Sequence, residues 1–154
     1  PPTGGWQPDD MEPASQEASL RGLAAEVEAH PDRYAGYWTS QTSDSPPRLI
    51  TVVNATESAD TVRPVLRAVF SGNLCVVEVP YDMNELRQVA ARMRASDPAW
   101  LADVDVPADR VRLQIAVPTT EMLSIIGADA SKVVIDPLVK RRQLDGAGRA
   151  GEAA

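Results

Sequence analysis

Apolar side chains recur at helical spacing in three stretches of the chain, residues 16–30, 60–70 and 82–96. In each stretch they lie three and four residues apart, which places them on one face of a helix. The third stretch begins with Asp82 and Glu85, three residues apart as in a capping box. The three stripes are Leu20, Leu23, Ala24 and Val27; Val62, Val65, Leu66, Val69 and Phe70; and Leu86, Val89, Ala90 and Met93.

The segments between these helices alternate apolar and polar residues, as half-buried strands do. Thr119 or Thr120 provides a cap for one further short helix, and Gly127 follows that helix as a stop signal. The predicted strands are residues 34–40, 48–54 and 74–80, a hairpin at 100–117, and 132–136, with the short helix at 121–126.

Helices and hairpins thus alternate in the order α-ββ-α-β-α-ββ-α-β. Because the helices separate strands, they must lie on the face of a sheet, and the two hairpins make part of that sheet antiparallel. The pattern predicts an α+β fold with a mixed, largely antiparallel sheet of about 5–6 strands and 3–4 helices packed on it. We find no internal repeat in the sequence.

The two ends of the chain differ from its middle. Residues 1–14 are rich in proline and acidic side chains, and residues 141–154 are small and polar; neither stretch has apolar periodicity. We therefore expect a flexible lead-in at 1–14, one α+β domain at 15–140 and a flexible tail at 141–154. The patterned region has the size of one ordinary domain.

Charge and composition argue against nucleic-acid binding, a metal site and a phosphate-binding loop. A net charge of −7 disfavours nucleic acid as a partner, because phosphate binding needs clustered basic side chains. A single cysteine, Cys75, and a single histidine, His30, provide too few thiolate and imidazole ligands for a metal site. Glycine-rich stretches occur only in the two tails, so no phosphate-binding loop is present. We expect no cofactor, no metal and no catalytic residues.

Two groups of carboxylates remain as candidates. Asp103 and Asp105 lie two residues apart on a predicted strand and point to the same face. Asp109 follows in the hairpin turn, and the second candidate group combines it with Asp82 or Glu85. Such groups can bind a cation or act as acid and base. The alternative is a solvated strand face with Asp109 stabilising the turn.

Three aromatic residues precede the long polar connection of the first hairpin. Tyr37 and Trp38 are candidates for a recognition surface, because both side chains offer a large contact area with few rotatable bonds. In the alternative interpretation, strand alternation places Tyr34 and Trp38 in the core and leaves Tyr37 facing water.

The succession of elements is similar to a pattern that is widespread in actinobacterial extracytoplasmic proteins. The residues that carry the similarity are Tyr34-Ala35-Gly36-Tyr37-Trp38, and the segments 49–53, 76–86 and 105–111, with Asp109 where the pattern usually has Asn. This pattern resembles the pro-segment lobe of secreted serine proteases of the streptogrisin and α-lytic type. Over residues 34–139 the resemblance implies an extracytoplasmic location and, in the protease relatives, folding and inhibition of a protease.

Three functions remain open. The first is a non-enzymatic module, secreted or tethered to the membrane, that binds a protein or another ligand, such as a protease or a cell-envelope protein. Its binding surface would include Tyr37, Trp38, Asp103, Asp105 and Asp109. The second is a protease pro-segment or inhibitor that presents a strand or tail to its partner. The third is a hydrolase that uses Asp103, Asp105 and Asp109.

Overall fold

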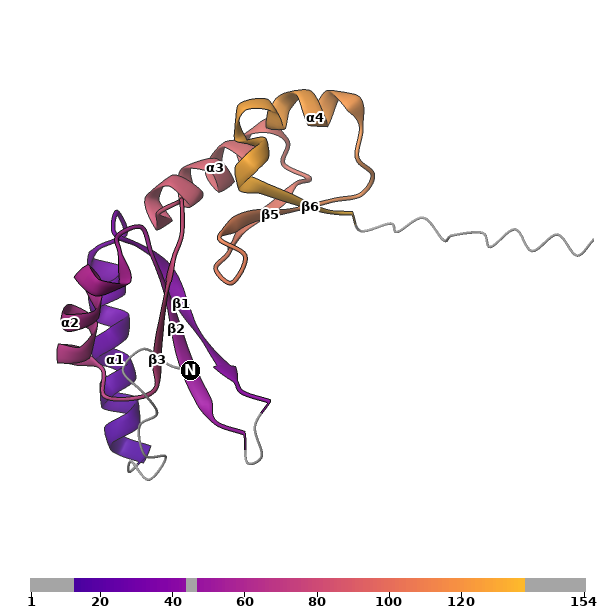
Figure 1. The fold of residues 1–154 in the computed structure, drawn as a ribbon. Coiled ribbons are helices and arrows are strands. Elements are labelled where there is room, and N and C mark those ends of the chain that lie inside the picture. The colour runs from indigo at the N-terminus through magenta and orange to yellow at the C-terminus, as the bar shows by residue number, and fades with distance from the viewer. Residues whose placement is uncertain (1–12, 44–46, 138–154) are drawn as a thin grey trace, which may run out of the picture.

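Helices and strands follow the predicted order in the computed structural model, which describes residues 13–43 and 47–137 (Figure 1). The chain is an α+β protein. Residues 1–12 of the predicted lead-in and the whole predicted tail lie outside the described residues. The elements are α1 (Pro13–Ala29), β1 (Tyr34–Gln41), β2 (Leu49–Ala55), α2 (Ala59–Val69), β3 (Leu74–Glu78), α3 (Met83–Ser96), β4 (Leu101–Asp105), β5 (Arg110–Ile115), α4 (Thr120–Ile126), the 3₁₀ helix η1 (Gly127–Lys132) and β6 (Val133–Pro137).

The strands form two sheets of three, not the one larger sheet that the sequence predicts. Their orders are β1-β2-β3 and β4-β5-β6. In each sheet the hairpin pair is antiparallel and the last strand joins in parallel, so the two kinds of pairing occur equally often. The prediction of one sheet was wrong because hairpin patterns specify local pairing only. They do not say whether β3 joins the second hairpin, and the whole of α3 separates them.

The two sheets reveal a repeat of architecture. A first half (residues 13–78) and a second half (residues 83–137) each consist of a helix, a hairpin, a second helix and a strand that joins in parallel. Pro31 lies three residues before β1, and Pro98 lies three residues before β4. The second residues of these strands, Ala35 and Ala102, are both buried. Few other positions match, which is why the sequence pattern does not reveal the repeat.

The first half has its core on one face of its sheet. Helices α1 and α2 both lie on that face (Figure 1). Leu23 and Val27 of α1 and Leu66 of α2 are buried there against the strand residues Val53 and Leu74. Helix α1 begins at Pro13, three residues before the predicted start, and proline is well tolerated in the first helical turn, where its missing N–H costs no bond.

The second half has its core between α3 and the sheet β4-β5-β6. All four apolar residues of the predicted α3 stripe are buried. The helix begins as predicted, because the Asp82 carboxylate accepts a 2.7 Å hydrogen bond from the backbone N–H of Glu85. The core residues of this half are Leu86, Val89, Ala90, Met93, Trp100, Ala102, Val111, Leu113, Ile115 and Ile126, joined by Ala35 from the first half.

Direct contacts join the two halves around β1 and the β4–β5 turn. The Asn54 side-chain amide donates a 2.7 Å hydrogen bond to the backbone carbonyl of Val106, and Asn54 is only 1% exposed. The backbone N–H of Asn84 donates to the Pro31 carbonyl at 3.1 Å. Gly36 has a φ of +117°, and a Cβ at this position would lie 2.9 Å from a methyl group of Val106. A glycine is therefore required where the halves meet.

Candidate functional site

Tyr37 and Trp38 lie on opposite faces of the first sheet. Tyr37 pairs with Val53 and packs on the core of the first half, whereas Trp38 pairs with Val52 on the other face. The alternative that placed Trp38 in the core and Tyr37 in water was therefore wrong for both residues. A β-bulge between Tyr34 and Gly36 explains the error, because one extra residue reverses the alternation beyond it.

Trp38 belongs to an apolar sheet face that α1 and α2 do not cover. Val52 and Cys75 are in register with it on β2 and β3, and Val77, 39% exposed, lies farther along β3. Ile50 belongs to the same face at the other end of β2. We call this set of five residues the open face. The β4–β5 turn limits it at one end, through the hydrogen bond from Asn54 to Val106.

Asp103 and Asp105 lie on the same face of β4, as the sequence predicts, and arginines neutralise both of them. The Arg94 guanidinium lies 3.6 Å from an Asp103 carboxylate oxygen, and the Asp103 side chain is largely exposed. Asp105 forms an ion pair with Arg112, which lies on the neighbouring strand β5. These acids therefore form part of a surface of alternating charge.

Asp109 is in a different environment from the other two acids. It is 5% exposed, it has a positive φ of 50°, and neither of its carboxylate oxygens accepts a hydrogen bond. Burial raises the pKa of this carboxyl, and nearby Glu85 adds to the rise. The Tyr81 backbone amide and the Arg110 guanidinium, 3.7 Å away, oppose it. Asp109 thus lies near Glu85, one of the two neighbours that the sequence suggests.

The three acids of the hydrolase hypothesis do not converge. Asp103 interacts with Arg94 and Asp105 with Arg112, whereas Asp109 lies near Tyr81, Glu85 and Arg110. The surroundings of Asp109 are also cationic, because Arg110 and Lys132 both lie over the Tyr81 ring, at 5.0 and 5.4 Å from its centre. Lys132 in turn forms a 2.6 Å ion pair with Glu85.

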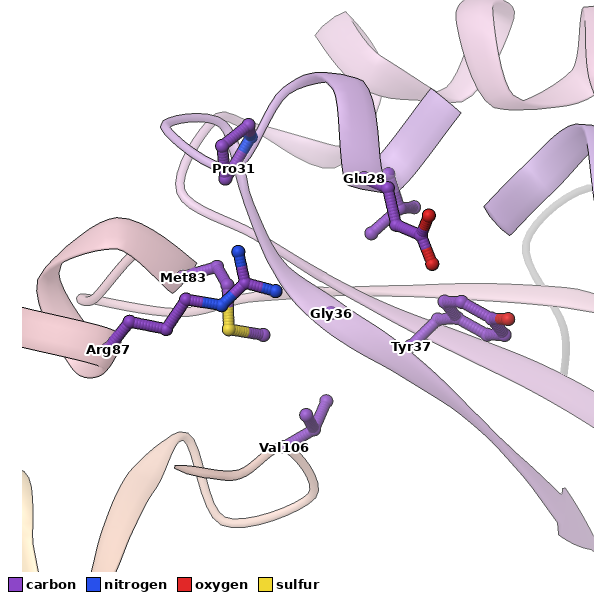
Figure 2. Close-up of a pocket in the computed structure, with 8 residues that line it drawn as sticks. Glu28, Pro31, Gly36, Tyr37, Met83, Arg87 and Val106 are labelled. Atoms are coloured by element: carbon purple, nitrogen blue, oxygen red, sulfur yellow. The ribbon is translucent and has the colours of Figure 1, made fainter. Parts of the chain in front are cut away.

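A pocket that the sequence does not indicate lies between the two halves. Figure 2 shows the residues that line it around Gly36. Its volume is about 180 Å³. We call it the junction pocket. Glycine inside a strand often marks a close backbone approach, and this is the one signal in the sequence that could have drawn attention to it. Its lining residues are Val27, Glu28 and Pro31 near the end of α1, Gly36 and Tyr37 of β1, Met83 and Arg87 of α3, and Val106 of the β4–β5 turn.

Three polar side chains of the junction pocket have no partner among the described residues. These are the Glu28 carboxylate, the Tyr37 hydroxyl and the Arg87 guanidinium, and no hydrogen bond or ion pair holds any of them within residues 13–43 and 47–137. In Figure 2, Arg87 approaches Gly36 from the α3 side, and Glu28 and Tyr37 lie on the other side. An apolar base with a few convergent polar groups is the usual form of a small-molecule site.

The part of the chain that the structure describes contains no group of three or more His, Cys, Asp or Glu side chains that could hold a metal ion. Within the same residues, no helix is both long enough and apolar enough to span a bilayer. No protein-family model matches this chain, and a search of curated proteins finds no significant match.

Proposed function

We propose that this protein is a non-enzymatic extracytoplasmic module that binds a protein partner through the open face. The observation that carries the proposal is that face itself. Among the described residues, α1 and α2 cover one face of the β1-β2-β3 sheet; on the other face Trp38, Ile50, Val52 and Cys75 are half-buried and Val77 is exposed. A contiguous apolar surface of this kind is typical of a protein interaction site.

The composition of the open face supports this role. Trp38 is the type of anchor residue that contributes most to protein interfaces, because its large ring loses few rotamers on binding. Trp38 is half-buried, and in register with it lie Val52 on the adjacent strand β2 and Cys75 on β3. The candidate acids lie elsewhere, on β4 and in the β4–β5 turn, and we assign them no role in this contact.

A secreted chymotrypsin-like protease is the first partner to test. The similarity of residues 34–139 to pro-segments of the streptogrisin and α-lytic type motivates this choice. The proposal assigns no hydrolase activity to the chain, because Asp103 and Asp105 are each paired with an arginine and Asp109 is buried with a different set of neighbours.

The experiment compares two matched valines. Val77→Asp places a charge on the open face, and Val134→Asp places one on β6 in the second half, where Val134 is 47% exposed. Binding to a streptogrisin-type protease is measured by biolayer interferometry, and inhibition by the hydrolysis of a peptide substrate. We expect Val77→Asp to weaken binding at least tenfold and Val134→Asp to leave it unchanged.

Equal binding by the wild type and Val77→Asp would show that the open face is not the contact surface. If the wild type neither binds nor inhibits the protease, that partner is rejected. The same pair of variants is then compared on isolated cell-envelope proteins, with the same criterion of selective loss in Val77→Asp.

A further inference from the structure

The junction pocket combines a cationic wall with an anionic wall. Arg87 lies on α3, and Glu28 lies near the end of α1, so the two opposite charges come from different halves of the molecule (Figure 2). Between them lie Gly36 and the apolar side chains of Met83 and Val106. An occupant that spans the pocket therefore has both charges and an apolar surface available to it.

Arg87 differs from most arginines of the chain in having no acidic partner among the described residues. Seven other arginines lie within 4 Å of a carboxylate oxygen. Those seven are Arg21, Arg33, Arg63, Arg92, Arg94, Arg110 and Arg112. An uncompensated guanidinium at a pocket is a ready carboxylate receptor, because its planar fork matches the two carboxylate oxygens.

Glu28 offers the complementary group. Its carboxylate has no partner in the described part of the chain, and the Tyr37 hydroxyl beside it provides a further donor and acceptor. A ligand with only a negative charge would meet Arg87 but leave Glu28 uncompensated. A ligand with only a positive charge would do the reverse. A ligand that carries both charges satisfies both walls.

We propose that the junction pocket binds a small zwitterion, a free α-amino acid or a short peptide, with its carboxylate on Arg87 and its ammonium group on Glu28. The apolar surface of Val27, Met83 and Val106 accepts the side chain of the ligand. The volume of about 180 Å³ fits this class, since it is below the roughly 300–1,000 Å³ of pockets for drug-sized ligands. This site is separate from the open face and independent of the proposed protein partner.

The test titrates the ¹⁵N-labelled protein with four probes and follows the backbone amides of Gly36 and Val106 by NMR. Leucine carries both charges, N-acetyl-leucine only the carboxylate, and leucine amide only the ammonium group. The dipeptide Leu-Leu separates the two charges farther than leucine does. We expect leucine or Leu-Leu to bind more tightly than the two singly charged probes, and the tighter of the two identifies a free amino acid or a peptide as the natural source.

Three variants assign the charges. Arg87→Gln should weaken the binding of leucine and of N-acetyl-leucine about fivefold, as expected for a solvent-accessible ion pair. It should leave the binding of leucine amide unchanged. Glu28→Gln should weaken the binding of leucine and of leucine amide but not the binding of N-acetyl-leucine. Arg21→Gln is the matched control, because Arg21 is an exposed arginine of α1 that pairs with Glu17 outside the pocket. Arg87 and Glu28 are exposed, so their variants should retain the wild-type spectrum.

Three results would overturn the proposal. One is the absence of any shift at Gly36 and Val106 with both leucine and Leu-Leu in the folded wild type. Another is an equal effect of Arg87→Gln and Arg21→Gln, which would indicate general electrostatics. The third is binding of N-acetyl-leucine as tight as that of leucine, with no effect of Glu28→Gln, which would indicate a site for anions alone.

Discussion

Replacing Gly36 with alanine tests the contact between the two halves directly. The added Cβ would lie 2.9 and 3.0 Å from the two methyl groups of Val106 and 3.2 Å from the Cε of Met83. Its φ of +117° is also strained for any L-residue, at a cost of about 1–3 kcal/mol. Forcing a methyl group into a filled contact adds about 1–3 kcal/mol. Together we expect Gly36→Ala to lower the free energy of unfolding by about 3 kcal/mol.

Two further variants separate the cost of the strained backbone from the cost of the steric contact with Val106. Gly127 also has a positive φ, of 25°, but a Cβ there would have no atom within 4 Å, so Gly127→Ala should cost only the backbone part. Val106→Ala removes the two methyl groups that the new Cβ would meet. In the double variant with Gly36→Ala, it should therefore recover about 1 kcal/mol of the loss, as a non-additive effect between neighbours.

The assay is urea unfolding followed by circular dichroism, with thermal unfolding as a second measure. For a chain of this size about 3 kcal/mol corresponds to roughly 10 °C in Tm. A Gly36→Ala protein that unfolds within about 0.5 kcal/mol of the wild type would refute the reasoning, because that is the range of ordinary surface substitutions. It would show that the halves do not meet tightly at this glycine.

Substitutions at three further positions test other parts of the structure. Burial raises the pKa of Asp109 above that of the unfolded carboxyl, which is about 3.9. Between these two pKa values the folded state holds the proton and the unfolded state has lost it. The free energy of unfolding therefore falls as the pH rises through this range. Asp109→Asn should be more stable than the wild type by about 1 kcal/mol at pH 7 and show little gain at pH 3, measured by urea unfolding at each pH; a gain that is constant with pH would contradict this. Asn54→Ala, which leaves the Val106 carbonyl without its donor, should cost about 1–3 kcal/mol by the same assay, and an unchanged midpoint would exclude a contribution from this bond. Asp82→Ala removes the cap on Glu85 and should cost about 1 kcal/mol in thermal unfolding, whereas Asp82→Asn should retain most of the stability.

Local elements were predictable because their signals are local. The α3 stripe and its Asp82 cap are confirmed, and Thr119 caps α4 as one of the two predicted alternatives. The predicted buried stripe of α2 included a residue that is not buried: Leu66 is buried, but Val65 is 38% exposed. An apolar residue at helical spacing faces the core only if another element lies opposite, and the sequence pattern does not contain that information.

The division into two sheets and the faces of β1 were not predictable in this way. Strand partners depend on how the helices pack, with α3 covering the sheet of the second half, and no hairpin pattern encodes this packing. A single bulge next to Gly36 reversed the expected faces of Tyr37 and Trp38. The junction pocket is assembled from residues of four separate elements, and its charged pair, Glu28 and Arg87, has no spacing in the sequence that marks it.

The position of Cys75 allows its thiol to report on the binding of a partner. It is the only cysteine of the sequence, it carries a free thiol, and it lies half-buried in register with Trp38 on β3. A thiol reagent therefore labels the protein at one defined point without any engineering. The rate of that labelling should fall when a partner covers the open face, on which Trp38 lies two strands from Cys75, so docking is readable in the native chain by mass spectrometry alone.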